Sequence, residues 1–169
     1  MDMVFLLARV IHIVTGVFWA GALIFTAFFL LPAIREAGPD GAKVAAGLIR
    51  RGFLTIMPLV ALLSILSGAW LYWKASVGFQ PAYMGSRPGM GYGLGAVTAL
   101  LAFGIGVTIV RPSMLRAAAL AQAAASAPAD REARMAEAQA LRMRAGKAGA
   151  VVAVLLVFTA LVMALARYL

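Results

Sequence analysis

Cysteine is absent from this chain of 169 residues, and histidine occurs only once, as His12. The lack of cysteine excludes disulfide bonds, thiolate metal sites and thiol catalysis. Charge is scarce as well, because 12% of the residues are charged, whereas soluble domains have about 25%. No acidic residue lies within an apolar run, which argues against a carboxylate proton relay or a carboxylate pair for hydrolysis. The sequence therefore gives no support to ordinary kinds of enzyme catalysis.

Apolar residues are abundant and make up 64% of the chain. A core built from so short a chain cannot absorb this much apolar surface, so lipid is the expected solvent for the rest. A run of about 20 apolar residues spans the hydrocarbon core as a helix, and four such runs are present. We therefore predict an all-α fold, a four-helix transmembrane bundle that forms a single membrane domain. The predicted helices cover residues 4–31, 53–73, 91–110 and 148–166.

A long connection, residues 111–147, separates the third and fourth predicted helices and is rich in Ala, Arg and Glu. The third helix is expected to stop at Arg111-Pro112, because proline cannot continue the backbone hydrogen bonding. The connection itself is predicted to form helical extensions beyond the membrane, with a break near Ser126–Pro128.

The basic residues are distributed unevenly between the connections. Eleven of the 15 lie in the first and third connections, and four lie near the opposite side. Basic loops stay in the cytoplasm, so both termini are expected on the outer side, which is the periplasm for the inner membrane of a bacterium. The net charge of +9 is thus read as topology and attraction to lipid headgroups, and nucleic acid is not expected as a partner.

His12 lies inside the first predicted span, where ionisable side chains are costly and usually functional. Arg9 is one turn nearer the outer surface on the same face, and Trp19 is two turns deeper. Gly16 lies between His12 and Trp19 and allows another helix to approach closely.

Small polar residues occur in the other predicted spans at about the depth of His12, which a rise of 1.5 Å per residue places about 12 Å from the outer end. These residues are Ser64, Ser67, Thr98 and Thr159. One interpretation is a polar layer that faces His12. The alternative is that each hydroxyl group bonds to the backbone of its own helix.

Three functional interpretations remain open for this site. Haem b would use His12 as one axial ligand and would need a second ligand from elsewhere. Copper fits an imidazole combined with methionine thioethers, and methionines occur toward the outer side at Met84, Met90 and Met163. The third interpretation is a structural or accessory protein without a ligand, packed on a larger membrane complex. The partner is expected to be such a complex or a second copy of the chain in a homodimer. For either assembly Gly91-x-x-x-Gly95 is a candidate helix-packing motif.

The segment from Arg9 to Gly21, which carries His12, Gly16 and Trp19 and is followed by Pro32, resembles the first span of the CopD-like copper-resistance membrane proteins. The related membrane-bound protoporphyrinogen oxidase family, whose members are four-helix haem b proteins, has a similar His-to-Trp helix. The Ser67-Gly68 turn before Trp70 is also similar to the end of the second span in this superfamily. The resemblance implies that His12 is the functional histidine, with copper handling or haem b binding as the function. The third predicted span contains no lysine, unlike that of the oxidase relatives, so the resemblance does not extend to oxidase activity.

Taken together, the sequence favours a small CopD-like inner-membrane protein that handles copper through His12.

Overall fold

A computed structural model describes residues 2–126 and 130–169, and most of this described chain is helical. The elements in chain order are α1 (Met3–Phe25), the π-helical segment η1 (Thr26–Leu30), α2 (Leu31–Glu36), α3 (Gly38–Arg50), α4 (Phe53–Ala75), α5 (Pro81–Met84), α6 (Arg87–Ile105), the π-helical segment η2 (Gly106–Val110), α7 (Arg111–Ser126) and α8 (Arg131–Ala166). The all-α prediction is confirmed for the described residues.

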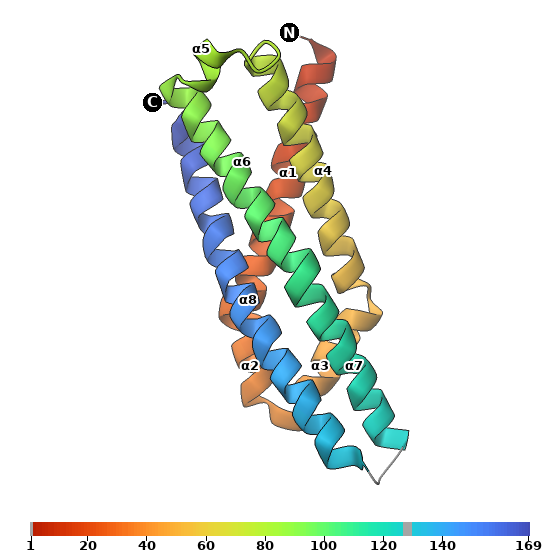
Figure 1. Cartoon of the computed structure of the whole chain (residues 1–169). Coiled ribbons are helices and arrows are strands. Elements are labelled where there is room, and N and C mark those ends of the chain that lie inside the picture. The colour runs from red at the N-terminus through yellow and green to blue at the C-terminus, as the bar shows by residue number, and fades with distance from the viewer. Residues whose placement is uncertain (1, 127–129) are drawn as a thin grey trace.

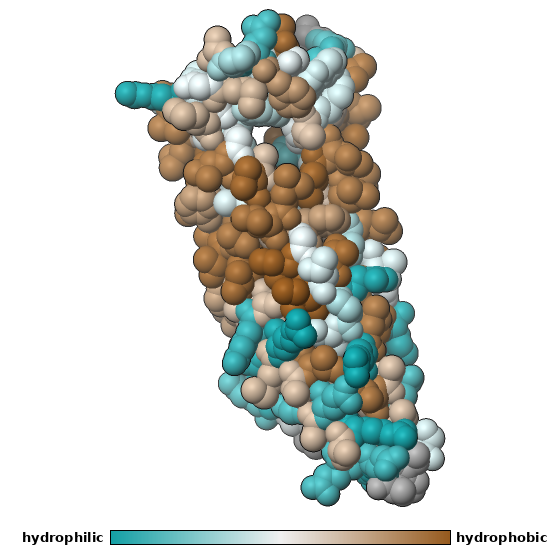
Figure 2. Space-filling model, viewed as in Figure 1, coloured by the Kyte–Doolittle hydropathy of each residue, from teal (hydrophilic) through white to brown (hydrophobic). Residues whose placement is uncertain are grey.

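Four continuous helical stretches are long and apolar enough to cross a membrane: Met3–Glu36, Phe53–Ala75, Arg87–Ser126 and Arg131–Ala166. Large apolar side chains on them point outward, for example Val17 at 69% exposed and Leu161 at 58%. In the space-filling view these side chains form a broad apolar belt, and hydrophilic residues gather at both ends (Figure 2). Such a surface is stable in lipid and would be a liability in water.

The long helices pack as two antiparallel pairs, α1 with α4 and α6 with α8. Figure 1 shows both termini and α5 at one end of the molecule. We call this the terminal end. At the opposite end α7 and the first half of α8 project beyond the other helices (Figure 1), and we call this the basic end.

The two pairs meet in a small core halfway along the bundle. Its largest member is Trp19, which is 5% exposed. The other members come from α4, α6 and α8, and they are Ala61, Ala99, Ala102, Val152 and Leu156. Alanines let the backbones approach closely, so the single tryptophan ring fills the centre between the four helices.

The expected stop of the third helix at Arg111-Pro112 is wrong, because the helix continues through the proline to Ser126. The Arg111 N–H bonds to the carbonyl of Gly106, five residues back. This wider π turn accommodates a proline ring that would clash with the carbonyl four residues back in a regular α-helix. The first span does the same, since η1 comes just before Leu31-Pro32 and the helix runs on to Glu36.

The expected helical extension is confirmed by α7 and by the first half of α8. The expected break near Ser126–Pro128 falls largely on residues 127–129, which lie outside the described part of the chain. The helix α8 runs without interruption from Arg131 to Ala166, so residue 148 marks a change of composition and not the start of a helix. The helix α3 in the first connection was not predicted.

Candidate site around His12

His12 projects from α1 onto α4, where its Nδ1 lies 2.8 Å from the main-chain carbonyl oxygen of Ser64. A carbonyl oxygen can only accept, so Nδ1 carries the proton and donates it. In the neutral imidazole the other nitrogen, Nε2, then has a free lone pair. A histidine that binds a metal typically has this arrangement, with one ring nitrogen fixed by a carbonyl and the other left to bind.

The space for the imidazole comes from glycine. A Cβ atom at Gly68 of α4 would lie 2.6 Å from His12 Cε1 and 2.9 Å from Nδ1, so any larger residue would displace the ring. One turn deeper, a Cβ atom at Gly16 would lie 3.2 Å from the Ser64 hydroxyl group. The predicted role of Gly16 in close helix approach thus corresponds to a contact between α1 and α4.

Aromatic side chains lie on both sides of His12 along the bundle axis. Trp19 is two turns deeper, in the core. Toward the terminal end, Tyr72 reaches from α4 to α6 and donates a hydrogen bond to the carbonyl of Gly89 at 3.0 Å. The ring of Tyr72 meets that of Tyr83 in α5 edge to face, with centroids 6.0 Å apart. Burial raises the pKa of the Tyr83 phenol, and Tyr92 and Tyr72 add to the shift.

The space-filling view shows an opening between the two helix pairs just below the cap that contains α5 (Figure 2). Tyr72 joins the pairs at the terminal end, and the core joins them deeper in the bundle. His12 therefore lies at a level between these two junctions.

The other small polar residues form two separate groups, one in each helix pair. Ser67 donates to the backbone of its own helix, at the carbonyls of Leu63 (2.7 Å) and Ser64 (3.0 Å). Thr98 and Thr159 hydrogen-bond to each other at 2.7 Å across the seam between α6 and α8. Thr98 and Thr159 also lie within hydrogen-bond distance of backbone carbonyls of their own helices. Among the described residues, no hydrogen bond links the group around His12 with the threonine pair.

The remaining candidate residues are Arg9 and three methionines. Arg9 is exposed and makes no ion pair within the described residues. Met84 and Met90 are 42% and 55% exposed near the terminal end. Met163 packs against Gly95 of α6. Gly95 lies seven residues from the core residue Ala102 toward the terminal end, and His12 lies seven residues from the core residue Trp19 in the same direction. Met163 and His12 are therefore at about the same depth in the bundle.

Gly91 and Gly95 of the predicted packing motif both lie against α8. A Cβ atom at Gly91 would be 2.9 Å from the Cβ of Ala166, and one at Gly95 would be 2.7 Å from Cγ of Met163. The motif is thus occupied by a helix of the same chain.

Two residues near His12 were missed as site residues. Gly68 was predicted only as part of a turn motif, although Ser64-x-x-x-Gly68 is a small-xxx-small pattern of the kind that marks close helix contacts. The sequence around Tyr72 does not indicate its role, because its hydroxyl group donates a hydrogen bond to a main-chain carbonyl in another helix.

No protein-family model, curated protein or solved structure that was compared matches this chain. The CopD-like resemblance therefore stays a prediction that depends on the residues of the first span. Within residues 2–126 and 130–169, no group of three or more His, Cys, Asp or Glu side chains could hold a metal ion. A metal at His12 would therefore need ligands other than a cluster of these side chains.

Proposed function

We propose that this chain is a CopD-like protein of the bacterial inner membrane that handles copper through His12. The observation that carries this proposal is the hydrogen bond of 2.8 Å from His12 Nδ1 to the carbonyl of Ser64. It fixes the tautomer and the direction of the ring, and it leaves Nε2 as a nitrogen ligand within the apolar part of the bundle.

The donors available near this depth favour a soft ion. An imidazole and a thioether suit Cu(I), and Met163 lies at about the level of His12 on the other helix pair. Carboxylates, which suit harder ions, occur only near the chain start and in the connections. The second ligand in this proposal is Met163, or else His12 of a second copy of the chain.

The proposal includes an orientation, with both termini in the periplasm and the basic end in the cytoplasm. Its support is the charge distribution, because eleven of 15 basic residues lie in the two connections at the basic end. In this orientation His12 is reached from the periplasmic side.

The direct test is a competition titration of the purified protein in detergent with a Cu(I) chelator. The unaltered chain is expected to bind copper stoichiometrically, and His12→Gln should weaken the affinity by at least about 10–100-fold, because the variant removes the nitrogen ligand. Ser64→Ala is the matched control, since it removes a hydroxyl group but keeps the carbonyl that orients His12. It should retain copper.

The same preparation separates the alternatives. A Soret absorbance that disappears in His12→Gln would replace copper by haem b. Neither metal nor pigment, even after copper loading, would favour an accessory subunit, which should then co-purify in a fixed ratio with a larger complex.

A further inference from the structure

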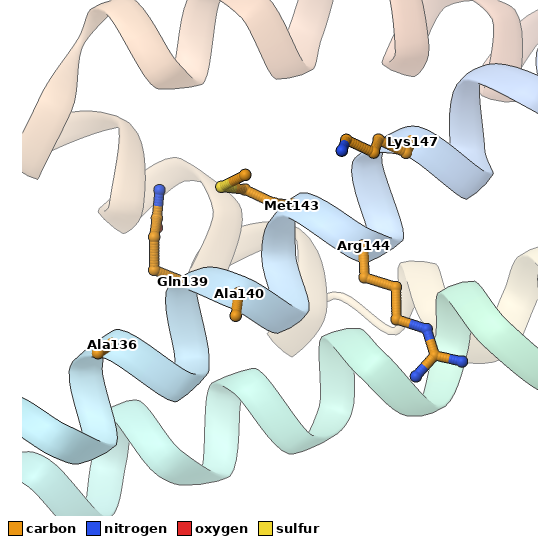
Figure 3. A pocket seen from close by; sticks show the side chains of 6 residues that line it. All are labelled: Ala136, Gln139, Ala140, Met143, Arg144 and Lys147. Carbon is orange, nitrogen blue, oxygen red and sulfur yellow. The ribbon is translucent and has the colours of Figure 1, made fainter.

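A hollow of about 630 Å³ lies along α8 at the basic end. Its lining residues follow one another at helical spacing, and they are Ala136, Gln139, Ala140, Met143, Arg144 and Lys147. An adjoining hollow of about 300 Å³ shares Gln139, Met143 and Lys147 and adds Arg35. In the close view Gln139, Met143 and Lys147 point to one side of α8, whereas Arg144 points to the other (Figure 3).

Two cations from different helices meet in this adjoining hollow. A Cβ atom at Gly146 would lie only 2.5 Å from Nη2 of Arg35, so the guanidinium group of α2 lies directly on the backbone of α8. Lys147 is the next residue of α8 and lines the same hollow. Gly146 therefore brings Arg35 beside Lys147, although the two residues are far apart in the sequence.

Neither cation has an anionic partner within the described part of the chain. The ion pairs of the described residues are Lys43–Asp40, Arg116–Glu137 and Arg134–Asp130. Glu36, the carboxylate next to Arg35 in the sequence, takes part in none of them. Two neighbouring positive charges repel each other, so an external anion would stabilise this arrangement.

The adjoining hollow, which Arg35 and Lys147 line, also lies at the boundary of the apolar belt. Arg35 is the first charged residue after the apolar run of the first span, and Lys147 is the last before that of the fourth. Basic residues that flank an apolar span are expected to lie near the lipid headgroups. A basic pocket between helices on the cytoplasmic side of a membrane is a typical binding site for an anionic lipid headgroup.

From these observations we infer that Arg35 and Lys147 bind the phosphate of an anionic glycerophospholipid. The guanidinium group donates two parallel hydrogen bonds to phosphate oxygens and the ammonium group adds a point charge. The amide of Gln139 donates a further hydrogen bond, and Met143 lies against the glycerol and upper acyl region. This site borders the apolar belt and is independent of the proposed copper site.

The test measures lipid binding to the full-length protein in a neutral detergent by native mass spectrometry. Phosphatidylglycerol, phosphatidylcholine and inorganic phosphate are the three probes. Phosphatidylglycerol is expected to bind most tightly. The double variant Arg35→Gln/Lys147→Gln should weaken that binding about 30-fold, because each basic residue contributes about 1 kcal/mol to attraction at an anionic surface.

The matched control is Arg51→Gln/Arg131→Gln, which removes the same net charge from exposed residues of the basic end. It should retain phosphatidylglycerol. A second variant, Gly146→Ala, keeps every charge but places a Cβ atom where the guanidinium group lies. It should weaken binding severalfold with unchanged helix content.

Three results would overturn the inference. Equal losses in the site and control double variants would show a diffuse surface potential instead of a site. Equal binding of phosphatidylcholine would exclude recognition of the net anionic lipid. Displacement of the lipid by inorganic phosphate at similar concentrations would show that a free anion is the ligand.

Discussion

At the scale of single residues, the position of His12 depends on a side chain that is missing from its neighbour. The imidazole occupies the space above Gly68, and the carbonyl of Ser64 holds its Nδ1. The orientation of His12 therefore comes from main-chain atoms and an absent Cβ, and not from a polar side chain. A histidine held in this way is sensitive to substitution of the residue that it packs against.

Gly68→Ala is expected to displace the imidazole while leaving the histidine in place. The new Cβ atom would lie 2.6 Å from Cε1, and the ring has to rotate away from the Ser64 carbonyl. Loss of such an orienting partner typically costs 10–100-fold in metal affinity, so a Cu(I) titration should show a loss of about tenfold or more.

The control for this variant is Gly21→Ala, on the same helix as His12. A Cβ atom there meets nothing within 4 Å, so copper affinity should not change. Unchanged affinity in Gly68→Ala would contradict the proposed role of the imidazole orientation.

At the scale of helices, the seam between α6 and α8 is built from small residues. Gly91 faces Ala166, and Gly95 makes room for Met163. Gly91→Ala is expected to lower the stability by about 1–3 kcal/mol, because its Cβ atom meets both Cβ and Cα of Ala166 and backbone cannot move aside easily. Thermal unfolding in detergent measures this change.

Gly104→Ala in the same helix is the control, since its Cβ atom would meet nothing within 4 Å. It should unfold at or above the temperature of the unaltered chain, because alanine favours helix more than glycine does. Equal effects at Gly91 and Gly104 would mean that the seam is not closely packed in the protein.

The helices could be predicted from the sequence better than their ends. Long apolar runs specify spans directly, because lipid leaves the backbone no partner outside a helix. Pro112 misled the prediction, since a π turn before it lets the helix continue. The helix α3 is short and begins with Gly38, Pro39, Asp40 and Gly41, which are residue types typical of turns, so the sequence does not indicate a helix there.

The site could be predicted only in part. His12 is conspicuous as an ionisable residue inside a span. Depth estimates place Ser64, Thr98 and Thr159 near the level of His12, but depth does not give the direction in which a side chain points. The structure places Ser64 beside His12 and joins the two threonines to each other, and this division follows from which helices pair.

At the scale of the whole molecule, the two helix pairs share a plan. In each pair the first helix runs toward the basic end, passes a π-helical segment just before an X-Pro sequence, and is followed by a helix that returns (Figure 1). Pairs that run in the same direction correspond to parallel repeats about an axis normal to the membrane. The opening in Figure 2 lies between these two similar units, below the cap that contains α5.

The proposed orientation of the whole molecule is tested by labelling single cysteines, which the cysteine-free chain allows without background. Ala82→Cys lies in α5 at the terminal end, and Ala125→Cys lies near the end of α7 at the basic end; both positions are exposed. A membrane-impermeant maleimide added to intact spheroplasts should label Ala82→Cys at once and Ala125→Cys only after the membrane is opened. The physical reason is the retention of basic connections in the cytoplasm. The opposite labelling order would reverse the topology and place His12 nearer the cytoplasm. That result would exclude access to His12 from the periplasm. The geometry around His12 and the lipid-binding inference would still be decided by their own tests.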